Sequence, residues 1–139
     1  MAESDRVTLP GFVNAHSHGF QRALRGRRTG GDFWAWREAM IEEAERQTPE
    51  LVRRGSAETY REMRAAGYTA VGEFHYLGLP EARAAVAAAG EAGIEITLLL
   101  TAYARGGSPR FRQASADEYV EQIGELRAEG YRVACAPHS

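Results

Sequence analysis

Lysine is absent from the 139 residues, so all 17 basic residues are arginine, and 19 acidic residues bring the net charge to −2. Neither a basic stripe nor a long run of like charge is present, which makes nucleic acids and anionic membranes poor partners. No apolar run reaches the roughly 18 residues of a membrane span, and the N-terminus lacks a signal-peptide pattern. The single cysteine, Cys135, has no partner for an internal disulfide, and its apolar neighbours predict a buried strand residue. These absences predict a soluble, cytoplasmic protein.

The chain repeats an order of helix, glycine and apolar strand. Strands are predicted at 7–15, 68–76, 94–101 and 131–136. Helices are predicted at 33–46, from Pro49 to a stop at Gly67, at 79–92 and at 116–129. This alternation predicts a parallel sheet with right-handed crossovers. Half of an eight-stranded barrel and an open four-stranded sheet both satisfy the pattern.

All four histidines lie at the exits of predicted strands, where sites collect in both barrels and doubly wound sheets. His16 and His18 are two residues apart, so in an extended backbone their side chains leave the same face. An H-x-H pair alone also occurs in ordinary turns, but this one follows an apolar strand and precedes Gly19, which permits close backbone approach. Neutral imidazole suits zinc, and a catalytic zinc commonly has three protein ligands. We therefore predict a zinc ion held by His16, His18 and ligands elsewhere.

The segment LPGFVNAHSHGFQRALRG, residues 9–26, resembles the first-strand signature of the amidohydrolase superfamily, whose metal-binding H-x-H ends strand one of a (β/α)8 barrel. With DFWAWREAM, EFHYL and the C-terminal APHS, it is similar to the formiminoglutamate deiminases. A complete barrel needs at least roughly 200 to 250 residues. The expected fold is therefore α/β, a partial (β/α)8 TIM barrel of about four βα units. It is expected to span 1–139 as one N-terminal half-barrel, with 1–6 disordered.

The resemblance implies that four residues contact the substrate: Gln21, Arg37, Tyr76 and His138. The planar guanidinium of Arg37 matches a carboxylate through two hydrogen bonds. His75 is expected to be a packing histidine, or one that supports other residues by a hydrogen bond. The third metal histidine, the catalytic histidine and the metal-binding aspartate of the family would lie beyond residue 139. No catalytic residue is therefore assigned within the chain.

The expected function is that of a zinc-dependent hydrolase in histidine degradation, which converts N-formimino-L-glutamate to N-formyl-L-glutamate and ammonia. Without lysine, the chain has no residue for the carbamylated lysine that bridges binuclear sites in this superfamily, which favours one metal ion. Another mononuclear amidohydrolase is the alternative, such as an imidazolonepropionase or a cytosine, guanine or adenosine-type deaminase. A non-catalytic, truncated half-barrel is a second. The expected partners are a small-molecule substrate and, through unpaired edge strands, a second copy or the missing half.

Overall fold

A computed structural model describes residues 7–27 and 31–138, to which all structural statements refer. The expectations for residues 1–6 and for the centre of the loop between Gly26 and Asp32 lie outside this range. The elements follow one another as β1 (Phe12–Ser17), η1 (Gly19–Leu24), α1 (Phe33–Arg46), α2 (Pro49–Ala65), β2 (Tyr68–His75), α3 (Leu79–Ala92), β3 (Glu95–Ala102), η2 (Pro109–Phe111), α4 (Ala116–Ala128) and β4 (Val133–Pro137). The two η elements are short 3₁₀ helices.

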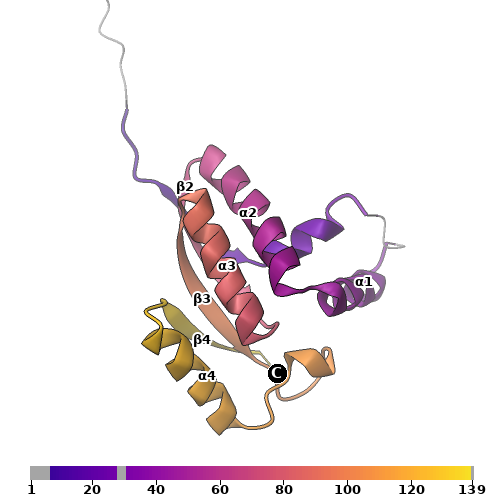
Figure 1. Ribbon diagram of the computed structural model, residues 1–139. Helices are drawn as coiled ribbons and strands as arrows, with labels where there is room; N and C mark the ends of the chain where they lie inside the picture. The colour runs from indigo at the N-terminus through magenta and orange to yellow at the C-terminus, as the bar shows by residue number, and fades with distance from the viewer. Residues whose placement is uncertain (1–6, 28–30, 139) are drawn as a thin grey trace, which may run out of the picture.

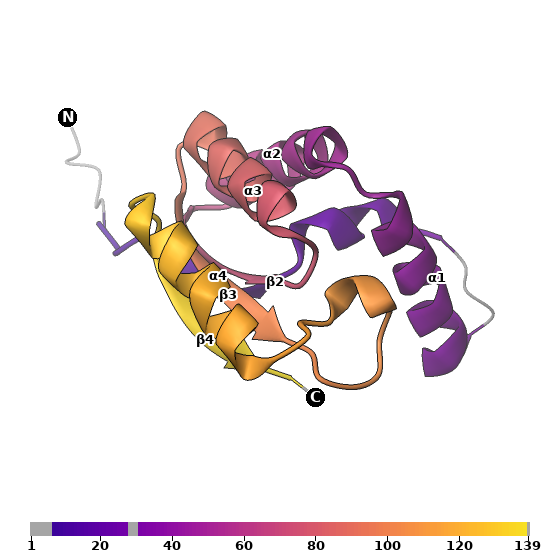
Figure 2. The ribbon, with the colours of Figure 1, turned by 60° about the horizontal axis from the view of Figure 1, so that its bottom comes forward.

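The four strands form one parallel sheet in the order β1-β2-β3-β4. Helices α2, α3 and α4 all cover the same face of this sheet, as Figures 1 and 2 show from two directions. A doubly wound sheet would carry helices on both faces and reverse its strand order. The described part of the chain does neither, so the partial TIM barrel is confirmed and the alternative, an open four-stranded sheet, is not.

Helix ends follow the local chemistry of the sequence. Asp32 caps α1 by accepting from the N–H of Ala35 (2.7 Å), and Thr48 caps α2 by accepting from the N–H of Leu51 (3.3 Å). Gly93 ends α3 in the left-handed region (φ 67°, ψ 37°), where a side chain would be strained. The predicted starts of these helices and the stop at Gly93 are confirmed.

Three apolar clusters join the helices to the sheet. One lies between α2, α3 and β2, and includes Ala57, Tyr60, Val71, Ala88, Ala89 and Ile94. A second lies between α3, α4 and strands β3 and β4, and includes Ala82, Leu98, Leu100, Ile123, Leu126 and Val133. The third lies at the carboxyl ends of the strands, and includes Phe20, Leu24, Met40, Tyr76, Tyr103 and Phe111. This third cluster forms the floor of the candidate site.

Two expectations are corrected. The first strand begins at Phe12, not at residue 7, and its early part is not buried: Val7 is 81% exposed and Val13 65%. Cys135 is exposed, not buried. The reason is the same for both, because β1 and β4 are the edge strands of the described sheet and each pairs on one side only. None of the helices in the described ranges is long and apolar enough to cross a membrane.

Candidate active site

The first strand is irregular where the H-x-H motif begins. Asn14 pairs with Val71 but Ser17 pairs with Glu73, so β1 carries one extra residue between these two positions. Such a bulge re-aims the side chains around it. The Asn14 side chain supports it, because Oδ1 accepts the N–H of His16 (3.1 Å). On β2, a Cβ at Gly72 would lie 3.1 Å from the Ala15 carbonyl oxygen, so glycine leaves room for the bulge.

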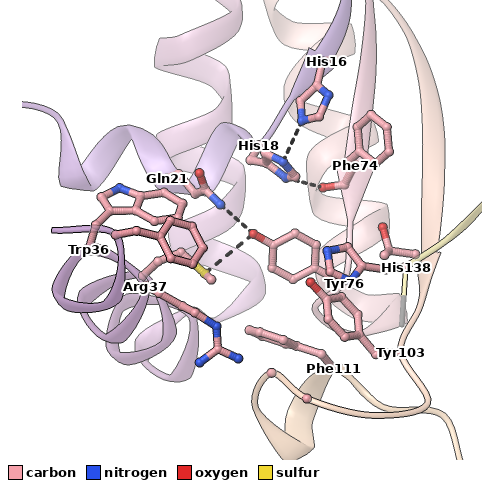
Figure 3. A pocket seen from close by; sticks show the side chains of 15 residues that line it. His16, His18, Gln21, Trp36, Arg37, Phe74, Tyr76, Tyr103, Phe111 and His138 are labelled. Carbon is pink, nitrogen blue, oxygen red and sulfur yellow. Dashed lines mark hydrogen bonds between the residues drawn. The ribbon is translucent and has the colours of Figure 1, made fainter.

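The two histidines of the motif face each other, with 3.1 Å between their Nε2 atoms (Figure 3). Nδ1 of His18 lies 3.2 Å from the carbonyl oxygen of Phe74, a contact in which the nitrogen must donate. Nε2 of His18 is then the unprotonated nitrogen. Burial is the main cause that lowers the pKa of His18, and it keeps the ring neutral. The ring therefore presents a lone pair toward His16.

This donor set fits a zinc ion. Two nitrogens held 2.0 to 2.1 Å from one tetrahedral ion would be about 3.3 to 3.4 Å apart, close to the observed spacing. The carbonyl of Phe74 is also the kind of partner that fixes the orientation of a metal-binding histidine. Within the described ranges, no group of three or more His, Cys, Asp or Glu side chains is placed to hold an ion. His16 and His18 could therefore supply two ligands to an ion.

A cavity of about 360 Å³ lies beside the histidine pair at the carboxyl ends of the strands (Figure 3). All six residues predicted from the sequence to form the site line it: His16, His18, Gln21, Arg37, Tyr76 and His138. They come from β1, η1, α1 and the segments after β2 and β4. The structure brings these residues together, while their individual roles stay predictions.

Tyr76 lies at the centre of the cavity floor. Its hydroxyl accepts a hydrogen bond from Nε2 of Gln21 (2.6 Å) and lies 3.7 Å from the sulfur of Met40. Burial raises the pKa of Tyr76, so the phenol keeps its proton. The Gln21 amide and the Tyr76 phenol thus form one fixed polar patch in an otherwise aromatic wall.

Arg37 extends from α1 toward the cavity (Figure 3). Among residues 7–27 and 31–138, its guanidinium makes no hydrogen bond or ion pair. Its charge acts on the Tyr103 phenol, lowering a pKa that burial raises more strongly. Tyr103 in turn stacks on His138, with ring centroids 4.3 Å apart and planes 19° from parallel. Tyr103 therefore feels the charge of Arg37 and contacts the ring of His138, which is itself close enough for its charge to act on His18.

Further lining residues were given no individual role by the sequence prediction. They are mostly aromatic: Phe33, Trp36, Met40, Phe74, Thr101, Tyr103, Gly106, Gly107 and Phe111. Tyr103 is the exception in position, because the sequence places it, like the histidines, at the exit of a predicted strand. Phe111 had no such signal, since its position depends on Arg110, which donates to the Ala44 carbonyl (2.6 Å) and to Glu81 (2.8 Å). These bonds fasten η2 to α1 and α3.

His75 does not line the cavity. It is 4% exposed and points toward the helices, with Nε2 3.0 Å from the Gly78 carbonyl oxygen. Burial lowers the pKa of His75 to about 4, so the ring is neutral and Nε2 donates. The expected packing role is confirmed.

Comparison with known proteins finds relatives in sequence and in fold. The chain is 39% identical to the formimidoylglutamate deiminase of Pseudomonas aeruginosa, over 88% of this chain and 32% of that protein. A solved amidohydrolase from Brucella melitensis is 33% identical, with a TM-score of 0.80 over 92% of this chain and 35% of its own. An adenosine deaminase from Xanthomonas campestris with bound zinc is 28% identical, with a TM-score of 0.69 over 93% of this chain and 29% of its own.

The chain thus spans about a third of the length of the relatives it matches. The sequence model of the amidohydrolase family matches residues 7–139, which is nearly all of the chain. The predicted resemblance is confirmed, and this chain belongs to the amidohydrolase family.

Proposed function

We propose that this chain supplies the first metal ligands and the substrate-binding wall of a zinc-dependent deiminase acting on N-formimino-L-glutamate in histidine degradation. The observation that carries the proposal is the arrangement of the cavity. A pair of convergent histidines lies at one side. At another lies the guanidinium of Arg37, which has no hydrogen bond or ion pair within the described residues. A site with a metal at one end and a cation at the other suits a substrate that has a reactive carbon at one end and a carboxylate at the other.

In this proposal His16 and His18 hold the ion through Nε2. A bound zinc supplies Lewis-acid activation of water at neutral pH. In the overall reaction water adds its oxygen to the formimino carbon, the C–N bond to the terminal nitrogen breaks, and ammonia leaves. The proposal requires that the remaining metal ligands and the proton-transfer residue come from outside the described residues.

The other residues of the cavity bind and orient the substrate. Arg37 would pair with a substrate carboxylate in a bidentate fashion, which fixes direction as well as position. The linked Gln21 amide and Tyr76 phenol, 2.6 Å apart, would bind a polar group of the formimino amino acid. His138, held against Tyr103, would complete the polar contacts. The aromatic walls would exclude bulk water and so strengthen these interactions.

A deaminase of the adenosine type is the second candidate. Tyr76, Tyr103 and Phe111 form a cluster with centroid distances from 4.8 to 5.8 Å, and such faces also suit a flat purine ring. The zinc-containing adenosine deaminase among the relatives supports this reading. We favour the deiminase, because a neutral purine gives Arg37 no anionic partner.

The test needs a complete barrel, made by fusing this chain in frame to the matching remainder of the Pseudomonas aeruginosa deiminase. Ammonia release is expected from N-formimino-L-glutamate and not from adenosine. Arg37→Ala should raise KM at least about tenfold and also lower kcat, because the lost carboxylate contact orients the substrate. Arg132→Ala is the matched control, since Arg132 forms an exposed pair with Glu95 (2.6 Å) at the amino ends of β3 and β4, opposite the strand ends that form the cavity, and should change neither. Turnover of adenosine, or an Arg37→Ala enzyme equal to its parent, would overturn the assignment.

We also propose that the exposed edges of the sheet mediate pairing with another polypeptide, either a second copy or a complementary half. Within the described residues, β1 and β4 each leave one row of backbone groups unpaired, which favours strand addition. Size-exclusion chromatography with light scattering would test this, and a clean monomer at high concentration would contradict it.

A further inference from the structure

Glu73 is a buried carboxylate that the proposed chemistry does not use. It lies on β2 with 2% of its surface exposed, and its side chain points toward the helices rather than into the cavity. Its Oε1 accepts the N–H of Gly19 at 2.6 Å, a short and charge-assisted contact. Gly19 is the residue directly after His18. A buried group on the second strand is therefore tied to the turn that carries the metal-binding histidines.

Among the residues that the structure describes, those around Glu73 supply hydroxyls but no cation. The groups that face it are Ser17 from β1, Gly19 from η1 and Tyr60 from α2, and Ser56 of α2 lies beside Tyr60. No ion pair to Glu73 exists in the described ranges. Burying a carboxyl group without a positive partner costs stability, and burial here raises the pKa of Glu73. An apolar residue would remove that cost, so the carboxyl group points to a task other than stability.

The turn at Gly19 is held from several sides. A Cβ on Gly19 would lie 2.8 Å from the Ser56 hydroxyl and 3.5 Å from Oε1 of Glu73, so the backbone lies directly between β2 and α2. The Thr59 hydroxyl donates weakly to the Gly19 carbonyl at 3.4 Å. On β2, the carbonyl of Phe74 accepts from the His18 ring at 3.2 Å. Glu73 and Phe74, neighbours on one strand, thus hold the Gly19 backbone and the His18 ring respectively.

We infer that Glu73 is a positioning residue for the metal site: by accepting from the Gly19 N–H it fixes the turn so that Nε2 of His16 and of His18 point at one ion. The inference rests on the proposed metal role of the two histidines. A free turn would let the two rings separate, and the affinity for an ion would fall although neither ligand had changed.

The test is a zinc titration of this chain, followed by NMR of the His16 and His18 imidazole resonances. Glu73→Ala should weaken zinc binding about tenfold, the lower range for loss of a group that supports metal ligands. Glu73→Gln should stay within about threefold, because its amide oxygen still accepts from Gly19. Glu43→Ala is the control: Glu43 is also buried, but it accepts from Gln47 (2.7 Å) and Arg27 (3.3 Å) and not from the Gly19 N–H. It should lower the melting temperature without changing zinc affinity.

A second pair of variants covers the case in which Glu73→Ala does not fold. Gly19→Ala should weaken zinc binding by pushing the turn away from Ser56, and adding Ser56→Ala should restore much of it by removing the hydroxyl that the new methyl group meets. Wild-type affinity in Glu73→Ala, or in Gly19→Ala where Glu73→Ala does not fold, would overturn the inference. A wild-type chain whose His16 and His18 resonances do not respond to zinc would instead overturn the proposed function.

Discussion

His75 should make the free energy of unfolding of this protein fall as the pH falls, because the helices that cover the sheet bury its ring. The ring is buried and its pKa is lowered to about 4 from an ordinary value of 6.5. Between these two values the unfolded chain binds a proton that the folded chain does not. Stability due to His75 is therefore fully present above pH 6.5 and is lost as the pH falls toward 4.

The magnitude follows from the two pKa values. A full shift of this size corresponds to about 3 kcal/mol, since each pKa unit is worth about 1.4 kcal/mol. Between pH 7 and pH 5 the linkage relation gives a loss of about 2 kcal/mol from His75 alone. That is a large part of the total stability of a domain of this size.

The assay is urea unfolding of the parent chain and of His75→Gln at pH 7 and pH 5. Glutamine can still donate from its amide nitrogen to the Gly78 carbonyl, but it does not titrate. Carboxylates contribute the same pH dependence to both proteins, so the difference between the two losses isolates His75. The parent should lose about 2 kcal/mol more than the variant. Equal losses would refute the reasoning, as would an imidazole resonance of His75 that titrates near pH 6.5 in the folded protein.

Four other outcomes are expected. His16→Ala should weaken zinc binding at least about tenfold in an NMR or calorimetric titration, because one ligand cannot chelate; unchanged affinity would place the metal elsewhere. Tyr76→Phe should lower the unfolding free energy by about 1 kcal/mol, since Gln21 loses its acceptor, and unchanged urea unfolding would show that this bond adds nothing. Arg110→Met should cost about 2 to 3 kcal/mol in urea unfolding by leaving the nearly buried Glu81 unpaired, and the loss should shrink when Glu81→Leu is added. The 139-residue chain alone should release no ammonia from N-formimino-L-glutamate, because the proton-transfer residue alone is worth about 10² to 10⁴-fold in rate.

Much of the site could be predicted because parallel strands deliver their exits to one edge. Given the repeated order of helix, glycine and strand, the positions of His16, Tyr76 and His138 after strands implied that they would lie close together. The three residues do line one cavity. Helix starts could also be predicted, because Asp32 and Thr48 cap their helices by accepting from the backbone N–H three residues later. Local rules and the direction of the strands were sufficient for these features.

Features that depend on contacts between residues far apart in the sequence could not be predicted. The bulge in β1 arises from pairing with β2, and Gly72, which makes room for it, is more than fifty residues away. Phe111 lines the cavity because Arg110 donates to groups on two helices. No local sequence pattern predicts these two contacts. The predicted burial of Cys135 and of the start of β1 was wrong for a related reason: apolar composition predicts a strand, but the neighbours of that strand decide its exposure.

Along β2 and the residue that follows it, neighbouring positions are under two different constraints, one from substrate binding and one from folding. Phe74 and Tyr76 face the cavity, whereas Glu73 and His75 face the helices. A mutational library at the first pair would therefore alter the cavity wall directly, while changes at the second pair would be filtered first by folding. A lineage that changes its substrate should thus accumulate substitutions at every second position along this segment. A laboratory evolution experiment could restrict its mutations to those positions.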